Sequence, residues 1–407
     1  MLEYWLWLTT RRGLGRQGMH AALRRFGSPE AVFYADAEAY RGIEGLKNAG
    51  PLEDKDLTEP RRILSECHRK SIHILTWQDA AYPARLRSID DPPLLLYYQG
   101  TLPDIDAELV VAMVGTRHAS LYGLQQGKTL GYQLGRLGAI VASGGADGVD
   151  TVCLTGALTA GGPVIAVLGC GVDVSYPAKN RGMFEDIRYH GCLISEYPPG
   201  TPPYPDNFPV RNRILSGISV GVVVVEAPEK SGALITASRA LEQGRDVFAL
   251  PANVGSPTSA GNLQLLKDGA ILVSEGADVM REYAALYPDR IAFQPPAVPM
   301  TLTAAETKAA RPAKVAEERT FPKKVDKKDV DNLENRDYID VQEISDKLSP
   351  DEAAVIGLLG AQPLPMDEII DRSQLPAARA LAAITLLEVK QYIQRLPGKR
   401  FALGKKR

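Results

Sequence analysis

Residues 109–145 are LVVAMVGTRHASLYGLQQGKTLGYQLGRLGAIVASGG, and this stretch decides the fold. Two short, almost wholly apolar runs at 109–115 and 139–145 flank a segment in which we expect a helix from about Tyr122 to Gly135. Strands that are apolar at nearly every position are typical of parallel sheets, because helices cover both faces of such a sheet. The stretch therefore predicts one strand–helix–strand unit of a doubly wound α/β domain.

The same alternation continues along the chain. Further apolar runs end in polar or glycine-rich loops: PVIAVLG (163–169), CLISEY (192–197), VGVVVVEA (220–227), VFALPA (247–252) and AILVS (270–274). Residues 72–100 precede them and predict two more strands around a turn that contains prolines. We therefore expect a doubly wound parallel sheet over residues 71–290, with ligands bound beyond the carboxyl ends of its strands.

Residues 1–70 predict a separate helical domain. Gly13-Leu14-Gly15 stands between two helical stretches, which resembles a helix-hairpin-helix or SAM-like domain. Such a hairpin can hold a phosphate with its amides, and Arg11, Arg12 and Arg16 are close by to help. Glycine is also common where one helix simply ends and packs against the next. Both interpretations stay open.

The C-terminal part predicts a linker and a second small domain. Residues 291–345 are rich in alanine, proline, lysine and acidic residues, which predicts a flexible linker. Ser349, Pro350 and Glu352 then form a complete helix start signal. Three helices and two strands around Pro397-Gly398 predict a winged helix over residues 346–407.

Composition excludes several classes of protein. A formal net charge of -2 on 407 residues means that any site for nucleic acid is a local patch. The four cysteines have no metal-binding spacing and predict reduced, buried thiols. No apolar run approaches the roughly 20 residues of a membrane helix. The first residues lack the features of a secretory signal, so we expect a cytoplasmic protein that has no membrane partner.

Residues 195–217, SEYPPGTPPYPDNFPVRNRILSG, contain the most concentrated binding chemistry. The prolines predict an ordered, non-helical lasso over residues 198–209. The lasso brings aromatic rings, Phe208 among them, close to Arg211-Asn212-Arg213. Guanidiniums bind phosphate and rings stack on bases. One arginine can instead be structural and bind Glu196 or Glu226, and we assign that role to Arg213.

The other loops at strand ends offer the same kind of groups. The first has Gly115, Thr116 and Arg117, with Ser120 placed to cap the following helix, and the second has Ser143 and Gly144. Lys179 follows the third strand, and Ser231-Gly232 open a helix after the fifth. Asp147 also lies in the second loop, and it would oppose an anion if it faced the pocket. Amides, guanidiniums, an ammonium group and rings suit the binding of a phosphodiester backbone rather than its cleavage.

Several catalytic and cofactor motifs are missing or misplaced. Residues 123–129, GLQQGKT, resemble a Walker A loop but are one residue short and fall inside a predicted helix. No GxGxxG follows the first strand with an acidic residue about 20 positions later, so no dinucleotide cofactor is expected. His118 is the only histidine in a strand-end loop, and no nucleophile, carboxylate pair or metal cluster accompanies it. We expect no cofactor, no metal and no catalysis.

At these motifs the chain resembles the DNA-processing protein A family (DprA, also called Smf). The motifs that carry the resemblance follow in order: GTRHASLYG, SGGADGVD, GCGVDVSYPAKN, SEYPPGTPPYPDNFPVRNRILSG, SGALITA and GRDVFALPA. Three positions depart from the family pattern. Thr116 replaces a serine, Cys153-Leu154 stands where a histidine is usual, and Ala252 replaces a glycine, which puts the shape of that last loop in doubt.

The resemblance implies an extended Rossmann fold that binds single-stranded DNA and loads the RecA recombinase onto it, as a homodimer and without catalysis. It also implies which residues form the DNA site. With the loop residues above, the predicted DNA-binding set is Gly115, Thr116, Arg117, Ser143, Gly144, Lys179, Phe208, Arg211, Asn212, Ser231 and Gly232.

Two other functions remain as alternatives. Related Rossmann-like enzymes cleave the N-glycosidic bond of nucleoside monophosphates with a PGGxGTxxE motif. Here SGALITASRALE lacks the PGG run, although Glu242 lies further along the helix. A regulator of duplex DNA would act through the winged helix. Its candidate recognition helix offers only Arg379 among alanines and leucines, which favours protein contact or packing over base recognition.

Overall fold

The structure is a computed structural model that describes residues 1–291, 348–359, 364–390, 392–396 and 400–403. The chain divides into two compact units, Met1–Ala316 and Glu317–Arg407. From residue 292 on, the predicted linker lies outside the described residues. Within the described part, no helix has both the length and the apolar character needed to cross a bilayer.

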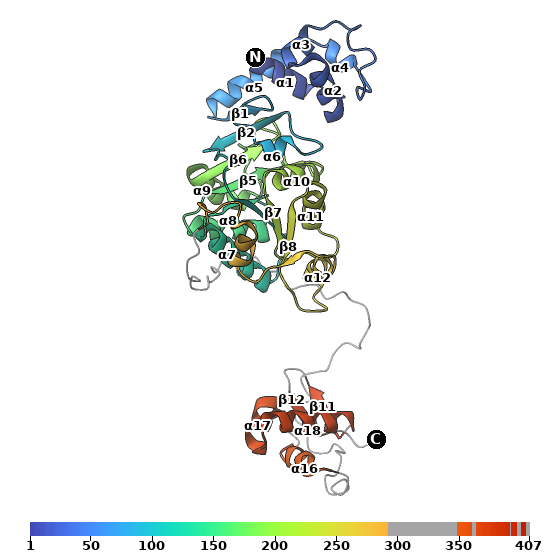
Figure 1. Cartoon of the computed structure of the whole chain (residues 1–407), viewed down its shortest axis with the longest axis vertical. Helices are drawn as coiled ribbons and strands as arrows, with labels where there is room; N and C mark the ends of the chain where they lie inside the picture. The colour runs from blue at the N-terminus through green and yellow to red at the C-terminus, as the bar shows by residue number, and fades with distance from the viewer. Residues whose placement is uncertain (292–347, 360–363, 391, 397–399, 404–407) are drawn as a thin grey trace, which may run out of the picture. The chain divides into compact units, whose positions relative to one another are not determined.

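A nine-stranded sheet forms the centre of the first unit (Figure 1). Its strands are β1 (His73–Thr76), β2 (Leu95–Gly100), β3 (Val110–Val114), β4 (Ile140–Ser143), β5 (Val164–Leu168), β6 (Gly191–Ser195), β7 (Gly221–Val224), β8 (Asp246–Ala249) and β9 (Ile271–Leu272). Their spatial order is β1-β2-β6-β5-β4-β3-β7-β8-β9. The strands from β6 to β9 in that order are parallel, and β1 and β2 add an antiparallel extension at the β6 edge. The predicted doubly wound sheet is confirmed.

The five central strands, β6, β5, β4, β3 and β7, are buried at every position because they are almost wholly apolar. In β3, Val111 and Met113 belong to one hydrophobic cluster, whereas Val110, Ala112 and Val114 belong to the other. Alternate side chains point to opposite faces, so each face needs its own helical layer. The helices of the first layer are α7 (Leu121–Arg136), α8 (Val149–Thr159), α9 (Arg181–His190) and α13 (Gly276–Tyr283). Those of the second are α6 (Ala84–Arg87), α10 (Asn207–Gly217), α11 (Gly232–Glu242) and α12 (Ala260–Lys267).

The strand order reverses between β3 and β7. The chain proceeds from β3 to β4, β5 and β6 on one side and from β7 to β8 and β9 on the other. Loops that leave the two central strands diverge at such a point and open a crevice at the carboxyl edge. At this edge Gly115–Arg117 follow β3 and Glu226 follows β7.

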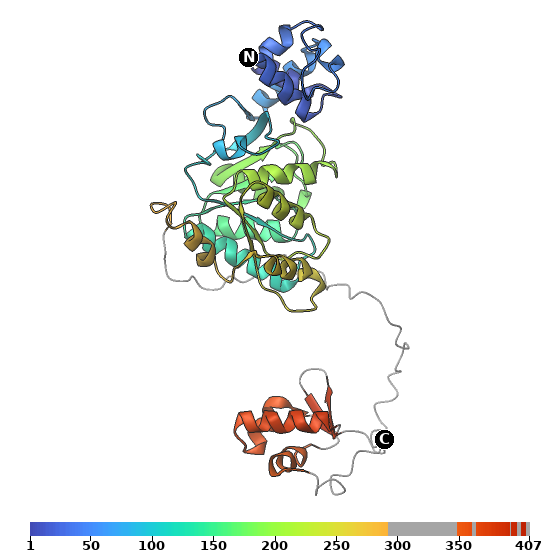
Figure 2. The same ribbon diagram turned by 45° about the vertical axis from the view of Figure 1, so that its right-hand side comes forward.

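The N-terminal helices lie at the β1 end of the same unit (Figure 2). They are α1 (Leu2–Thr10), α2 (Arg16–Phe26), α3 (Pro29–Tyr34), α4 (Gly50–Glu53) and α5 (Thr58–Arg69). Trp7 and Tyr40 are fully buried among them, and Lys55 Nζ lies 5.1 Å from the Trp7 ring centroid. Gly13 has φ +81°, so glycine is required at the turn between α1 and α2. The predicted helical character of residues 1–70 is confirmed.

The lasso prediction was wrong at its C-terminal end. Residues 198–206 are free of helix, but α10 begins at Asn207 and contains Phe208 and Pro209. Proline is tolerated in the first turn of a helix because the amide that it lacks would have no partner there. Arg211, Asn212 and Arg213 therefore belong to a helix, and their side chains point in different directions.

The second unit has the predicted winged-helix elements. It contains α16 (Pro350–Ile356), β10 (Leu364–Pro365), α17 (Met366–Ser373), α18 (Ala377–Val389), β11 (Ile393–Leu396) and β12 (Arg400–Leu403). Ser349 and Glu352 form the predicted capping box, with Pro350 at the first helical position. In α18, Arg379 makes two hydrogen bonds to Asp351, of 2.6 and 2.9 Å. That arginine is 62% exposed and is paired within the domain.

Candidate nucleic-acid interface

The loop after β3 is held at its base by two neighbouring elements. Thr116 N donates to the Glu226 carbonyl oxygen over 2.7 Å, and Val149 N donates to the Thr116 carbonyl oxygen over 3.3 Å. A Cβ atom on Gly115 would lie 2.5 Å from Val149 Cγ2. Glycine at position 115 therefore allows α8 to approach the loop. Arg117 follows and is exposed at the rim.

A buried carboxylate supports this loop from below. Glu226 is 1% exposed, and its Oε2 accepts a hydrogen bond of 2.8 Å from Ser120 N. Its Oε1 accepts hydrogen bonds from Thr258 and Ser259 over 2.5 and 3.3 Å. Ser120 caps α7 as predicted, because its Oγ accepts a hydrogen bond from Gly123 N. The polar groups beneath the loop are thus hydrogen-bonded within the protein.

Two loops meet at the ring of Phe208, which belongs to the first turn of α10. The Arg117 guanidinium carbon lies 5.1 Å from the centroid of that ring. The Tyr176 ring, from the loop after β5, lies 5.7 Å away between centroids and is 39% exposed. A Cβ on Gly169 would lie 2.9 Å from Phe208 Cδ1, so the ring rests directly on the end of β5. Arg117, Phe208 and Tyr176 therefore place a cation and two rings side by side.

The rim has a second cation, and it is paired. Lys179 Nζ lies 2.5 Å from Asp147 Oδ1, and both side chains are well exposed. The pair joins the loop after β5 to the loop after β4. Asp147 therefore faces the same rim as Lys179 and partly neutralises it in the absence of a ligand.

Arg211 lies beneath the rim, where it does not meet solvent. It is 4% exposed, and its Nη1 donates to the carbonyl oxygens of Gly144 and Val167. A Cβ on Gly144 would collide with Arg211 Nη2, so glycine gives the guanidinium its place. Burial raises the pKa of Asp150, and the nearby Arg211 opposes that shift. The expected direct contact between Arg211 and DNA is at odds with this burial, and the residue instead braces the second loop.

Two other predicted contacts are also structural. Ser143 is fully buried and donates to the Met113 carbonyl oxygen over 2.6 Å. Asn212 is 8% exposed and donates to the Gly232 carbonyl oxygen over 3.3 Å. Their hydrogen-bonding groups are used inside the protein. Both therefore shape the site rather than line it.

Ser231 and Gly232 stand where α11 begins. The Ser231 hydroxyl accepts a hydrogen bond from Ala233 N over 3.2 Å and so caps the helix. Gly232 is exposed, and a Cβ built on it meets nothing within 4 Å. The backbone here is accessible, and Asn212 ties it to α10.

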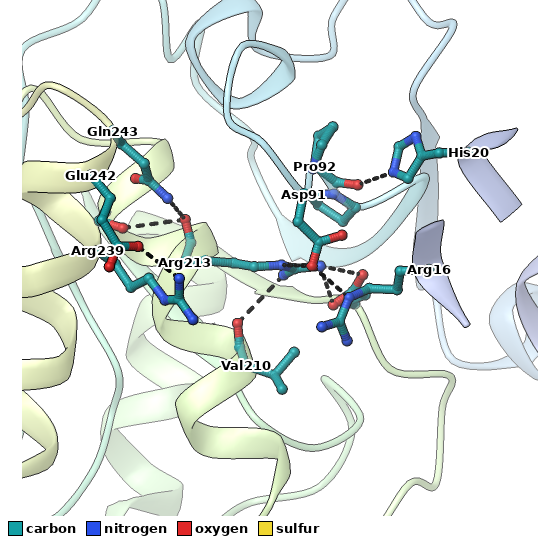
Figure 3. Close-up of polar contacts among 12 residues, drawn as sticks. Arg16, His20, Asp91, Pro92, Val210, Arg213, Arg239, Glu242 and Gln243 are labelled. Carbon is teal, nitrogen blue, oxygen red and sulfur yellow. Dashed lines mark hydrogen bonds and ion pairs between the residues drawn. The ribbon is translucent and has the colours of Figure 1, made fainter. Parts of the chain in front are cut away.

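Arg213 has the predicted structural role. Its Nη2 donates to both carboxylate oxygens of Glu196, over 2.7 and 2.9 Å. Its Nε donates to Asp91, which also accepts from Arg16, so the two arginines converge on one carboxylate (Figure 3). The partner is Glu196 and not Glu226. The network ties the lasso and α10 to the segment before β2 and to α2.

The basic residues of the predicted N-terminal hairpin are partly engaged. Arg11 pairs with Asp54 over 2.7 Å, and Arg16 pairs with Asp91 over 2.6 Å. Arg12 is exposed. Of the three, Arg16 is the one that reaches the main sheet.

The turn after β8 accepts Ala252 without strain. In the described part of the chain, the non-glycine residues with positive φ are Ser71 and Gln374. Ala252 therefore has an ordinary backbone conformation. The loss of the family's glycine does not force a different turn.

The structure separates Glu242 from the rim. Glu242 is the last residue of α11, whereas Ser231 stands just before the first residue of that helix, at the rim. The 11 residues of the helix span about 16 Å. Its carboxylate binds Arg239 over 2.7 Å. The described residues hold no group of three or more side chains suited to bind a metal ion. The four cysteines are buried and free, as predicted.

Sequence reasoning missed two rim features. Tyr176 stands out in the sequence only as part of a motif, although an aromatic residue in a strand-end loop is itself a signal for stacking. The pairing of Asp147 with Lys179 depends on two loops that are distant in sequence. Only the three-dimensional structure shows that these two loops meet.

The fold defines a Rossmann-like α/β protein that also has a winged-helix unit. The sequence profile of the family described as "DNA recombination-mediator protein A" matches residues 73–284, and that of the "DprA winged helix domain" matches residues 342–399. The DNA processing protein DprA of Bacillus subtilis is 37% identical over 54% of this chain and 74% of its own length. That of Streptococcus pneumoniae is 42% identical over 50% of this chain and 72% of its own length.

Structure comparison agrees with the sequence. An X-ray structure of DNA processing protein A (DprA) from Streptococcus pneumoniae aligns with a TM-score of 0.60 and 32% identity, covering 72% of this chain and 99% of that one. The chain belongs to the DNA recombination-mediator protein A family, also known as DprA or Smf.

Proposed function

We propose that this chain binds single-stranded DNA at the rim formed by residues 115–117, 176–179 and 208. One observation supports this most strongly: the exposed Arg117 guanidinium lies against the ring of Phe208. A phosphate can bind the guanidinium while the adjoining base stacks on a ring, and this combination suits a flexible single strand. Lys179 adds a second phosphate contact once it leaves Asp147.

The bound strand is held rather than cut. In this proposal Arg211, Asn212, Ser143 and the buried Gly144 shape the loops, while Gly115, Thr116, Ser231 and Gly232 lie where the strand can reach them. Membership in a family of recombination mediators supports a further step, in which the chain acts in the cytoplasm as a homodimer and loads RecA onto the strand. The candidate recognition helix α18 consists mostly of alanine and leucine, which favours a winged helix that contacts protein.

The domain boundaries belong to the same proposal. They are 1–70 for the helical domain, 71–290 for the DNA-binding domain, 291–345 for a linker and 346–407 for the winged helix. Limited proteolysis followed by mass spectrometry tests them, with cleavage expected first between residues 291 and 345. Early cleavage inside 71–290 would contradict them.

A gel-shift experiment tests the binding site. Wild type and Arg117→Ala are titrated against single- and double-stranded oligonucleotides of equal length at moderate salt. We expect wild type to prefer the single strand and the variant to lose most of that affinity. Equal affinity of the two proteins for the single strand would refute the site.

Two further assays test the steps beyond binding. RecA loading is measured as the rise in DNA-dependent ATP hydrolysis by RecA on a single strand, and sedimentation reports the oligomeric state. Incubation with AMP addresses the enzymatic alternative, and we expect no adenine to be released. Release of adenine would replace the binding proposal with hydrolysis of nucleoside monophosphates.

A further inference from the structure

A hollow lies where the N-terminal helices meet the lasso. Its volume is about 180 Å³. It is lined by residues of α2, of the start of β2, and of the segment that leads from β6 into the lasso: Arg16, Met19, His20, Leu95, Glu196 and Tyr197. None of these residues takes part in the rim described above.

The size of the hollow selects its occupant. An apolar cavity of about 150 Å³ holds one benzene ring. Sites for drug-sized ligands are larger, about 300–1,000 Å³. A hollow of 180 Å³ therefore accommodates a single six-membered ring and excludes a whole nucleotide.

The charges around the hollow are already balanced. Arg16 binds Asp91, and Arg213 binds both Asp91 and Glu196, so two guanidiniums face two carboxylates (Figure 3). The His20 ring lies in hydrogen-bonding contact with the Pro92 carbonyl oxygen at 2.8 Å. A free anion gains little from walls of this kind. A neutral planar ring gains apolar contact with Met19, Leu95 and the ring of Tyr197.

The hollow and the rim are neighbours across the lasso. The Tyr197 hydroxyl donates to the Asn207 carbonyl oxygen over 3.4 Å, and Asn207 Nδ2 donates to the Gly169 carbonyl oxygen over 3.0 Å. Phe208 follows Asn207 and rests on Gly169. A single strand of DNA that passes Phe208 therefore reaches Tyr197 after it crosses one segment of the protein chain. The Arg16 side chain, 44% exposed at the start of α2, donates to Asp91 through Nε, and its other guanidinium nitrogens can contact a phosphate outside the hollow while that ion pair persists.

We propose that this hollow is a second nucleotide site on the path of the single strand, in which one pyrimidine base inserts beside Tyr197 and Arg16 holds the adjoining phosphate. The inference rests on the proposed single-strand binding. It gives the N-terminal helical domain a part in DNA recognition.

An abasic scan of oligo-dT tests the proposal with wild-type protein. A single abasic site is moved along the oligonucleotide, which removes one base and keeps its phosphate. We expect two separate sensitive positions, each weakening binding by at least about fivefold, the low end for one stacked base. Only one sensitive position would overturn the second site and leave the proposed function intact. No binding by any oligonucleotide would overturn the function itself.

Two variants assign the second position to the hollow. Met19→Trp fills the hollow and should abolish sensitivity at the second position while the first persists, with folding checked by circular dichroism. Arg16→Ala should lower the affinity for the long oligonucleotide severalfold. Arg61→Ala, which removes the same charge on the same domain, should leave that affinity unchanged. A second position that survives Met19→Trp would contradict the assignment. In wild type, 4-thiothymidine at that position should crosslink to residues 16–20 or 195–198, and a crosslink elsewhere would overturn it.

Discussion

The guanidinium carbon of Arg117 lies 5.1 Å from the centroid of the Phe208 ring. Arg117 comes from the loop after β3 and Phe208 from the first turn of α10. A cation above an aromatic face is attracted to it, so the ring restrains a side chain that would otherwise move freely. Restraint before binding reduces the entropy lost when a phosphate is bound. The pair therefore provides a pre-oriented group at the rim.

Replacement of Arg117 tests its role in phosphate binding. Arg117→Ala should lower the affinity for oligo-dT roughly tenfold or more, as expected when hydrogen bonds to a charged group are removed. The log–log salt slope should flatten by roughly 0.7 for each phosphate that the variant no longer neutralises. Fluorescence anisotropy at several salt concentrations measures both. Arg62→Ala, which removes an equally positive and exposed side chain paired with Glu59, is the control and should change neither.

A double-mutant cycle tests the coupling between Arg117 and Phe208. Phe208→Leu keeps an apolar side chain on Gly169 but removes the aromatic face. If the ring orients the guanidinium, the loss in the double variant should be smaller than the sum of the two single losses. Strict additivity of the binding free energies would show that the two residues act independently. Tyr176→Leu is expected to weaken binding less, because the ring that lies against the Arg117 guanidinium is that of Phe208.

The contrast between Arg211 and Arg213 shows what sequence could predict. Two positions along a helix turn the side chain by about 200°, so the two arginines point to opposite sides of α10. Arg213 was correctly assigned as structural because carboxylates such as Glu196 stand close in sequence. Arg211 binds the carbonyl oxygens of Gly144 and Val167, and no sequence pattern reveals a free carbonyl.

The fold was more predictable than the site for a similar reason. In β3, β4 and β5 almost every consecutive residue is apolar, so the sequence alone predicts that these strands are buried on both faces. The pairing of Lys179 with Asp147 depends on the distance between two loops. Helix α10 begins at Asn207 and has Pro209 in its first turn. Because several other prolines precede Pro209, the sequence does not show that this one belongs to a helix.

Removal of the Asp147 carboxylate should strengthen DNA binding. Lys179 is held by Asp147 without ligand, and a phosphate must displace that carboxylate. Asp147→Asn frees the ammonium group and removes a negative charge from the rim. An exposed ion pair contributes about 0.2–1 kcal/mol, so affinity should rise by up to about fivefold. Lys179→Ala should lower affinity, and Asp147→Asn should have little effect in that background. Weaker binding by Asp147→Asn alone would show that Asp147 does not oppose DNA.

Arg213 should matter for stability more than any rim residue. Its guanidinium is almost fully buried between Glu196 and Asp91. Without Arg213, Asp91 keeps its pair with Arg16 but Glu196 loses its guanidinium, and removing one partner of a buried ion pair costs about 3–5 kcal/mol. Arg213→Ala should therefore lower the free energy of unfolding by that order in urea titrations, provided the variant folds. Arg62→Ala should cost less than about 1 kcal/mol, as an exposed pair does. Similar losses in the two variants would contradict the structural role of Arg213.

The same network should make stability depend on acid. Burial raises the pKa of Asp91, but the guanidiniums of Arg213 and Arg16 lower it by more than burial raises it. The pKa of Asp91 in the folded protein is therefore below the ordinary value. A carboxylate with a depressed pKa stabilises the fold above its unfolded pKa of about 3.9 and loses that effect as pH falls through the folded value. Urea unfolding is measured from pH 6 down to the lowest pH at which the protein stays folded. Below about pH 4, the free energy of unfolding should fall more steeply with pH in wild type than in Asp91→Asn. Asp186→Asn, at an exposed position on α9, is the control and should follow wild type. Parallel curves for wild type and Asp91→Asn would show that Asp91 gains nothing from its two arginines.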